Sequence, residues 1–402
     1  MTERIGVLFV SNGYGEDNVA AHIAAVLQKQ HVDISVSGFP TVGSGRFYTE
    51  CGVALAGSGI RMPSEGFVRS ARDLAGDVRR GLVSETLRMG KRVRHAAAEA
   101  DYIVVTGDPY LLLYTTLFTK AERPRKIFIG TLQSEWYGSG RPFKEHYSIL
   151  ERLWLRLFCG LAIARDAKTA AYLQEKGVRH AVSFGNPMMD CFAVPQARIF
   201  PGDRTVIGIL PGSKQEAYAN FGTIIETVEA LMTRSGKKQN YLFAVAISPH
   251  LAVEELQKRF GLRQAGPCKY DPAFSVYRTK DRGIELHVTS RRFGGVIEEA
   301  DLVIGLSGTG NEQAAGLGKP VVGFWGEGPQ ITRKFMEAQK RLLGVSLFLC
   351  PPDPVTVARR IEEVLEDKGL LQSVSNNGRE RMGGTGSVTS IARRIEEYIS
   401  RS

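Results

Sequence analysis

The chain has 402 residues, enough for two domains, and 43% hydrophobic with 23% charged residues is an ordinary globular composition. These values exclude a largely disordered or fibrous chain. The net charge of +10, spread over both halves, favours anionic partners such as a nucleotide, a phosphorylated substrate, an anionic membrane surface or nucleic acid.

Membrane-spanning and disulfide-rich classes are also disfavoured. No apolar run reaches the roughly 20 residues that a spanning helix needs. The N-terminal segment MTERIGVLFVSNG has the pattern of a strand and lacks that of a signal peptide. The five cysteines are scattered without a CxxC pair, so we expect a protein of the reducing cytoplasm without a disulfide framework.

Short apolar runs alternate with longer amphipathic segments in the first half of the chain. We expect strands at residues 5–10, 34–39, 102–107 and 126–131, with AVSFGNP at 181–187 closing this half. We expect helices at residues 18–30, 150–158 and 167–176, and a long, basic, largely helical stretch at 66–100.

The second half repeats this alternation after a break rich in turn residues. Expected strands are 206–212, 241–248, 285–290, 301–307 and 320–325, and expected helices include 224–234, 354–366 and 388–401. Alternating strands and helices predict an α/β fold of two Rossmann-like, doubly wound parallel-sheet domains facing across a cleft. The expected boundaries are residues 1–188, a linker at 189–203, a second domain at 204–385 and a C-terminal helix at 386–402.

Ligands of such sheets bind at the carboxyl ends of the strands, so the turns there hold the candidate residues. The first strand runs into Gly13, Tyr14, Gly15, Glu16 and Asp17. The glycines permit a tight turn before a helix, but the dinucleotide fingerprint and the P-loop are both absent. Acidic residues at a helix start suit either the helix dipole or a role in substrate binding or catalysis, and both interpretations stay open.

Asp108 ends another buried strand in the sequence TGDP. A carboxylate there can accept a proton from a hydroxyl nucleophile. The plain alternative is an Asp-Pro turn without a function.

Two turns of the second half suit an anion. Gly212, Ser213 and Lys214 combine N–H groups, a hydroxyl and a cation. Ser307, Gly308, Thr309 and Gly310 precede a helix whose dipole favours a diphosphate, with Glu312 and Gln313 placed to hydrogen-bond a ribose. The alternatives are a solvated turn and glycines needed only for packing.

Weaker signals remain. The loop at residues 323–330 and the turn SFGNPMMD, which contains Asn186, suit sugar contacts but are common turn sequences. No D-x-D or H-x-x-x-H occurs, so no metal site is expected. Basic residues at 69–94 and mixed aromatic and basic residues at 136–158 suit either an anionic lipid interface or a solvated face over core aromatics.

In this order, the motifs resemble the lipid-A-disaccharide synthase family, and more closely its lipid-A-disaccharide synthase-related branch. The specific matches are LPGSK at 210–214 and the SGT segment from Ser307 to the Pro-Val-Val strand that ends at Val322. The loop at 11–17, Asp108 and the GNPMMD turn at 185–190 also match. The resemblance covers most of the chain and implies a GT-B glycosyltransferase fold.

The resemblance further implies an inverting transfer of a sugar from a UDP-sugar to a lipid-linked acceptor at the cytoplasmic membrane face, without a bound metal or other cofactor. The nucleotide-sugar site would comprise Gly212, Ser213, Lys214, Ser307, Gly308, Thr309, Gly310, Glu312 and Gln313. The catalytic carboxylates would be Asp108, the leading candidate for the base, with Glu16 and Asp17 close by. Gly13, Tyr14, Gly15 and Asn186 would bind the acceptor. The sugar, the acceptor and the formation of a homodimer stay open.

Three other functions are compatible with the sequence. One is a UDP-N-acetylglucosamine 2-epimerase-like enzyme, which would need several histidines and carboxylates around one sugar and no lipid surface. Another is a non-catalytic nucleotide-sugar-binding protein. Nucleic-acid binding rests on charge alone, and no known binding module supports it, so we expect no such partner.

Overall fold

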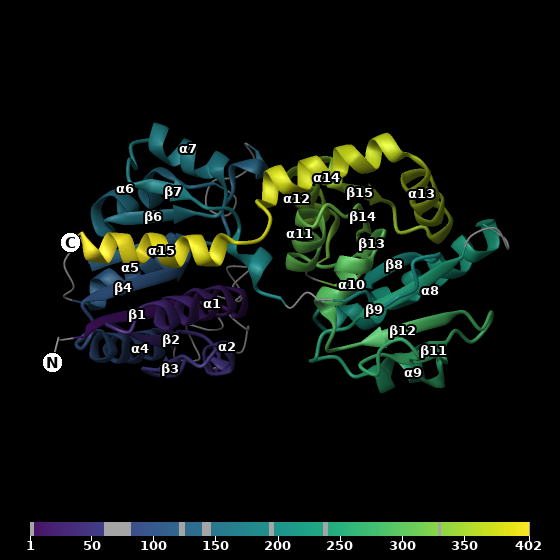
Figure 1. Ribbon diagram of the computed structural model, residues 1–402, viewed down its shortest axis with the longest axis horizontal. Coiled ribbons are helices and arrows are strands. Elements are labelled where there is room, and N and C mark those ends of the chain that lie inside the picture. The colour runs from purple at the N-terminus through teal and green to yellow at the C-terminus, as the bar shows by residue number, and fades with distance from the viewer. Residues whose placement is uncertain are drawn as a thin grey trace. The chain divides into compact units, whose positions relative to one another are not determined.

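The computed structural model describes residues 4–59, 82–119, 125–138, 146–192, 197–235, 240–328 and 331–401. The chain forms two compact units, one of Met1–Cys191 with Thr385–Ser402 and one of Phe192–Gly384. Each unit has its own sheet flanked by helices (Figure 1).

The first unit is built on a seven-stranded parallel sheet in the order β3-β2-β1-β4-β5-β6-β7. Its strands are β1 (Ile5–Ser11), β2 (Ile34–Pro40), β3 (Ala54–Leu55), β4 (Tyr102–Gly107), β5 (Lys126–Gly130), β6 (Leu161–Ala164) and β7 (Ala181–Ser183). The central strands β4 and β5 are buried along their whole length, as expected for parallel strands covered on both faces.

Two sets of helices cover this sheet. The described helices are α1 (Tyr14–Gln30), α2 (Arg46–Glu50), α4 (Leu82–Ala97), α5 (Pro109–Phe118), α6 (Ile149–Phe158), α7 (Ala167–Glu175) and α15 (Ser387–Ser400), with short 3-10 turns η2 (Glu135–Tyr137) and η3 (Pro187–Asp190). Buried side chains of α1 and α15 pack on one face, and those of α4, α5, α6 and α7 pack on the other.

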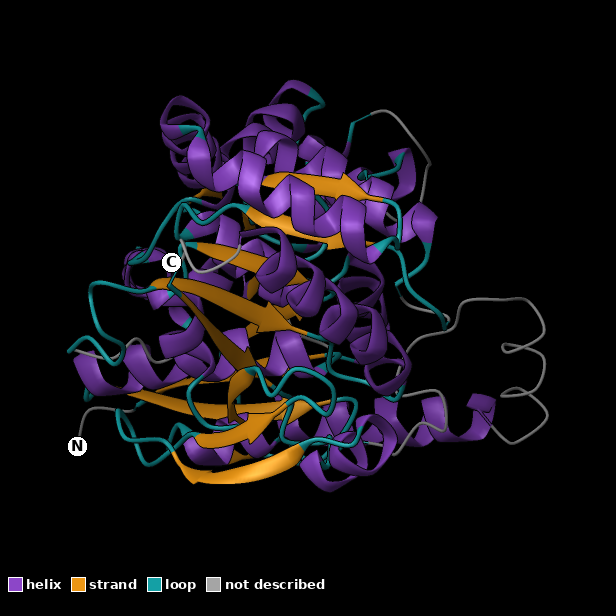
Figure 2. Cartoon of the chain, turned by 90° about the vertical axis from the view of Figure 1, so that its right-hand side faces the viewer, coloured by secondary structure: helices purple, strands orange, loops and turns teal. Residues whose placement is uncertain are grey.

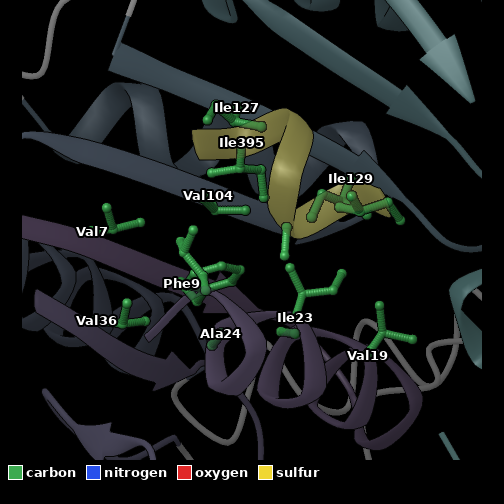
Figure 3. Close-up of a cluster of buried hydrophobic side chains, with 14 of the residues drawn as sticks. Val7, Phe9, Val19, Ile23, Ala24, Val36, Val104, Ile127, Ile129 and Ile395 are labelled. Carbon is green, nitrogen blue, oxygen red and sulfur yellow. The ribbon is translucent and has the colours of Figure 1, made fainter. Parts of the chain in front are cut away.

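The C-terminal helix α15 is part of this first core although it follows the second unit in sequence. Its residues Ile391, Ile395 and Ile399, spaced by four, are buried against the sheet and α1. Figure 3 shows Ile395 of α15 between Ile127 and Val104, with Ile23 of α1 below them.

The second unit has an eight-stranded sheet in the order β10-β11-β12-β9-β8-β13-β14-β15. Its strands are β8 (Thr205–Leu210), β9 (Tyr241–Ala246), β10 (Arg263–Pro267), β11 (Ser275–Arg278), β12 (Glu285–Thr289), β13 (Leu302–Gly305), β14 (Val321–Phe324) and β15 (Leu347–Cys350). The strands from β12 to β15 are parallel, whereas β10 and β11 pair antiparallel at one edge.

Helices flank this sheet on both sides (Figure 2). They are α8 (Glu216–Ser235), α9 (Val253–Phe260), α10 (Phe293–Glu299), α11 (Thr309–Gly316), α12 (Arg333–Leu343), α13 (Pro354–Glu366) and α14 (Lys368–Met382), with a 3-10 turn η5 (Gly344–Ser346). The expected class of two Rossmann-like parallel-sheet domains is confirmed.

Both units use the same device to fix their first strand. The carboxylate of Asp101, just before β4, accepts a hydrogen bond from the Gly6 N–H at 2.8 Å. Asp301, just before β13, accepts one from the Val206 N–H at 2.8 Å. In each unit, therefore, an aspartate that precedes a neighbouring strand holds the first strand in place.

The structure corrects several expected boundaries. Helix α1 begins at Tyr14 instead of residue 18, because Gly13 adopts an extended conformation and caps it. Helix α8 begins at Glu216, eight residues before the expected 224. The segment at 181–187, expected to close the first half, contains the strand β7, which ends at Ser183 because Gly185 has a φ of 92° and Pro187 opens a 3-10 turn.

Within the described residues, no helix is long and apolar enough to cross a membrane. Of the basic stretch at 69–94, residues 69–81 lie outside the described part of the chain.

Candidate functional site

Polar side chains meet at the carboxyl edge of the first sheet, where β1, β4 and β5 end. The Asn12 side-chain amide donates to Asp108 Oδ2 at 2.9 Å, which joins the turns after β1 and β4. The Thr131 hydroxyl, just after β5, lies 3.5 Å from Glu16 Oε1. Gly107 permits this approach, because a Cβ on it would lie 2.1 Å from Asn12 Oδ1 and its φ is 147°. Parallel strands thus bring together residues that are far apart in sequence.

Asp108 is the N-cap of α5. Its Oδ1 accepts a hydrogen bond from the Leu111 N–H at 2.9 Å, and Pro109 occupies the first helical position. The residue before a proline favours the extended conformation that an N-cap needs, so the local sequence fixes this turn. The carboxylate is half-buried and held by both oxygens, with further lone pairs available to a ligand.

Glu16 lies in the first turn of α1, and only 8% of the residue is exposed. Burial raises the pKa of its carboxyl, and the nearby charge of Asp108 raises it further. Glu16 and Asp108 therefore form a pair of carboxylates at one edge, in which burial favours the protonated form of Glu16.

Asp17 belongs to a sealed network below this edge. The Ser11 hydroxyl donates to Asp17 Oδ1 at 2.6 Å and lies 2.7 Å from the Tyr48 hydroxyl. Burial raises the pKa of Asp17 to about 7, and the residue is only 1% exposed. Asp17 therefore lacks the access to substrate that Asp108 has.

The expected acceptor-binding residues fall into two kinds. Tyr14 is exposed at the start of α1, next to Gly13 and Gly15, so it is available to a ligand. Asn186 is buried, and its side-chain oxygen accepts from the Met188 N–H at 3.1 Å as the cap of η3. The environment of Asn186 matches the turn interpretation of GNPMMD.

At the carboxyl edge of the second sheet, the turns after β8 and β13 lie side by side. The Leu306 N–H donates to the Leu210 carbonyl at 2.9 Å. Gly212, with a φ of 110°, comes so close that a Cβ on it would lie 3.1 Å from the Leu306 carbonyl oxygen. Ser213 is exposed and Lys214 half-buried at this edge.

The start of α11 completes this second edge. The helix begins at Thr309, and the Ser307 hydroxyl accepts from the Gly310 N–H at 3.2 Å. A Cβ on Gly310 would lie 2.9 Å from that hydroxyl and 3.1 Å from Leu210 Cδ1, so a side chain here would displace the Ser307 hydroxyl. Small residues thus leave the N-terminus of α11 open at the strand ends, which is the arrangement that binds phosphate groups in many proteins.

Glu312 and Gln313, one turn into α11, are both almost fully buried. The Gln339 side-chain amide of α12 lies 3.3 Å from Glu312 Oε1 and orients that carboxylate. The structure therefore brings together the expected residues from Gly212 to Lys214 and from Ser307 to Gln313 at one sheet edge.

Two features of this edge were missed in the sequence. Buried Asn220 of α8 accepts from the Glu327 N–H at 2.8 Å and so fixes the glycine-rich loop after β14. A cavity of about 270 Å³ opens where β12 ends, lined by Val253, Pro272, Ala273, Ser275, Tyr277, Val288, Thr289, Ser290 and Arg291. Neither has a local motif, because both depend on elements brought together by the fold.

No group of three or more His, Cys, Asp or Glu side chains suited to a metal ion occurs among the residues that the structure describes.

No protein-family model matches the chain, and no curated protein matches its sequence. Solved structures do match over nearly the whole length. S. aureus MnaA in complex with UDP shares 14% identity over 98% of this chain and 97% of that one, with a TM-score of 0.62. The calicheamicin glycosyltransferase CalG4 shares 13% over 99% of both, with a TM-score of 0.66. A Neisseria meningitidis UDP-GlcNAc 2-epimerase bound to UDP-GlcNAc shares 13% over 99% of this chain and 100% of that one, with a TM-score of 0.55.

These likenesses and the two sheets define a GT-B fold, shared with glycosyltransferases and UDP-GlcNAc 2-epimerases.

Proposed function

We propose that the chain is a glycosyltransferase that moves a sugar from a UDP-sugar to a lipid-linked acceptor with inversion at the sugar carbon. The observation that supports this most directly is that one GT-B chain carries both a candidate base and a candidate diphosphate site. One sheet edge holds the accessible carboxylate of Asp108, and the other holds an open helix N-terminus beside a Gly-Ser-Lys turn.

In this proposal the second unit binds the donor. The diphosphate lies at the N-terminus of α11 near Ser307, Gly308 and Thr309, with Ser213 and Lys214 beside it. The helix dipole and N–H groups stabilise the negative charge that develops on the departing UDP. The cavity where β12 ends lies at the same edge of this sheet, two strands from β8, and is available to the nucleoside end.

The first unit then supplies the base. The acceptor hydroxyl attacks the anomeric carbon, its proton passes to Asp108, and the bond from that carbon to the diphosphate breaks to release UDP. Asp108 is favoured over Asp17 because Asp108 is half-exposed and Asp17 is sealed. Glu16, whose pKa is raised, limits charge repulsion at this edge by retaining a proton more readily. A peripheral contact with the cytoplasmic membrane face would bring in the lipid-linked acceptor.

The second candidate is a UDP-N-acetylglucosamine 2-epimerase-like enzyme, favoured by the same fold match. It requires no lipid acceptor and no membrane contact. Conversion of UDP-GlcNAc to its 2-epimer without any acceptor would support the epimerase and contradict the transferase.

The first test is thermal unfolding of the protein with UDP, GDP, CMP and NAD. A ligand at 100 times its dissociation constant adds about 2.7 kcal/mol, which is a visible shift. We expect a shift that is selective for UDP and is lost in Ser307→Trp, which fills the donor edge. Gln372→Trp, on the exposed side of α14, is the matched control and should keep the shift.

Transfer is then measured with UDP-sugars and detergent-solubilised membrane lipids. UDP release together with a glycosylated lipid is expected. The absence of a shift with any nucleotide would contradict the proposed donor site, and UDP binding without turnover would indicate a non-catalytic nucleotide-sugar-binding protein.

A further inference from the structure

The solvent-facing side of α6 is apolar. Ile149, Leu150, Leu153 and Leu157 are 76%, 54%, 41% and 38% exposed, respectively. Because they are three to four residues apart, they form one continuous stripe, called here the α6 outer face. Elsewhere on this fold, exposed positions of helices are mainly polar, as on α13 and α14.

Helix α6 buries its carboxylate and exposes its aliphatic side chains, which is the reverse of an ordinary surface helix. Its only acidic residue, Glu151, is fully buried, where it accepts from the Gln133 side chain at 2.9 Å and the Ser148 N–H at 2.7 Å. Of its two cations, Arg156 is exposed beside the outer face, whereas Arg152 is half-buried and donates to the Tyr147 carbonyl at 3.0 Å and to the Tyr172 hydroxyl. The helix therefore presents aliphatic groups and positive charge to solvent, with no exposed carboxylate of its own.

Neighbouring helices extend this surface. On α5, which packs against α6, Leu117 is 72% exposed, and exposed Tyr110 stacks edge-on against Trp154 at 5.3 Å. On α4, which packs against α5, the exposed cations are Arg88, Lys91, Arg92 and Arg94, of which Arg88 pairs with Glu85 and Arg92 donates to the Ser58 hydroxyl. Basic residues thus lie beside the apolar stripe on α6 itself and, beyond α5, on α4.

The aromatic residues of 136–158, which suit a lipid interface in the sequence, do not form this surface. Tyr147 is buried and Trp154 packs on Tyr110, while residues 139–145 lie outside the described part. The exposed apolar groups of the segment are aliphatic.

We propose that the α6 outer face is the docking surface for an anionic lipid bilayer. A short amphipathic helix with aliphatic residues flanked by arginines lies flat in the interface, where its apolar side chains enter the acyl boundary and its guanidinium groups reach lipid phosphates. The positive border selects an anionic bilayer over a second copy of this basic chain.

The role of this surface in delivering the acceptor rests on the proposed function. Gln133, which holds Glu151 of α6, lies two residues after Thr131, the residue beside Glu16. Leu132 between them is 45% exposed. Docking by α6 would therefore place the bilayer near the carboxylates that receive a lipid-linked acceptor.

The test is flotation of the full chain with vesicles of phosphatidylcholine and phosphatidylglycerol in equal parts, and with phosphatidylcholine alone. Because each serine removes an aliphatic side chain from the acyl boundary, Ile149→Ser with Leu153→Ser should lower the partition coefficient by at least about tenfold. Arg156→Gln should weaken binding to the anionic vesicles alone. The matched control replaces Val32 and Val355, two exposed valines away from α6, with serine and should float like the unaltered chain.

Equal flotation of both double variants, or no flotation of the unaltered chain, would overturn the proposal. Self-association that is lost in the α6 variant, without vesicle binding, would assign the face to a second copy instead. Sugar transfer to a detergent-solubilised acceptor separates the two proposals. The α6 variant should retain it, and a chain that binds vesicles but has no transferase activity would contradict the proposed function alone.

Discussion

Asp17 lies in a buried hydrogen-bonded chain with Ser11 and Tyr48, and its pKa rises from 3.8 to about 7. A carboxyl whose folded pKa is raised stabilises the fold fully below the unfolded pKa, and this contribution is lost as the pH rises to the folded pKa. Between pH 5 and pH 8 the loss amounts to roughly 2–3 kcal/mol.

Asp17→Asn should remove this dependence, since the amide oxygen can still accept from Ser11 without ionising. The free energy of unfolding of the variant, relative to the unaltered chain, should therefore rise between pH 5 and pH 8. Denaturant titrations at both pH values measure it, with Asp33→Asn at an exposed position as the control. Parallel pH profiles for Asp17→Asn and the unaltered chain would show that ionisation of Asp17 does not lower the free energy of unfolding.

Asp108→Asn separates the structural role of this residue from the proposed catalytic one. Asparagine is as good an N-cap as aspartate, so the bond from the Leu111 N–H and the start of α5 should persist. An amide cannot accept the acceptor proton, and loss of a general base typically costs 10²- to 10⁴-fold in rate.

We therefore expect the turnover rate of Asp108→Asn to fall by about that factor while the melting temperature and the UDP response stay unchanged. Asp353→Asn, at the N-cap of α13 in the other unit, is the matched control. Retained turnover in Asp108→Asn, with loss in Glu16→Gln, would move the base to Glu16.

At the scale of elements, the sequence predicts those whose own side chains are buried. The fully apolar runs of β4 and β9 mark them as strands because parallel strands are covered on both faces. Strand β10, with the sequence RQAGP, is mostly exposed and is held by pairing to β11, so no local pattern reveals it. The start of α1 was missed because glycines at 13 and 15 lower helix propensity, whereas Gly15 packs against Met188 of η3.

The residues of the candidate site also divide into those with a local sequence signal and those without one. The turns holding Asp108, Ser213 and Ser307 could be found because each follows a recognisable strand. The residues that position these edges could not be found, because Asn12 reaches Asp108, Asn220 reaches Glu327 and Gln339 reaches Glu312 only across the fold.

Helix α15 begins with a cap supplied from elsewhere in the chain. No side chain of its own caps it, and the Asp190 carboxylate accepts from the Gly386 N–H at 2.6 Å and the Val388 N–H at 2.7 Å. Loss of a capping side chain costs about 1–2 kcal/mol. Asp190→Ala should therefore lower the stability of the first unit by about that amount and speed hydrogen exchange in the first turn of α15.

Asp353→Ala removes an ordinary N-cap, that of α13, and serves as the comparison. It should speed exchange in α13 and leave α15 unchanged. Unchanged exchange at residues 387–390 in Asp190→Ala would show that packing of α15 on α1 is sufficient to hold its first turn.

At the scale of the whole molecule, the first unit is discontinuous in sequence. Its core includes Ile391, Ile395 and Ile399, which follow 193 residues, Phe192–Gly384, that form the second unit. A chain that ends at Gly384 would expose the face of α1 and the sheet that α15 covers. Truncating a single buried isoleucine to alanine costs 2–5 kcal/mol, and three are removed here together, against a typical total stability of 5–15 kcal/mol.

We therefore expect that truncation at Gly384 unfolds the first unit and spares the second. Limited proteolysis followed by mass spectrometry should show cleavage throughout residues 5–191 and a protected fragment within 197–384. If the donor site lies in the second unit as proposed, UDP should still raise the melting temperature of the surviving transition. A chain ending at Ser400, which retains all of α15, should behave as the full chain. Protection of residues 5–191 in the shorter chain would mean that the first core is stable without α15, and loss of the UDP response from an intact second unit would mean that the donor site needs the first.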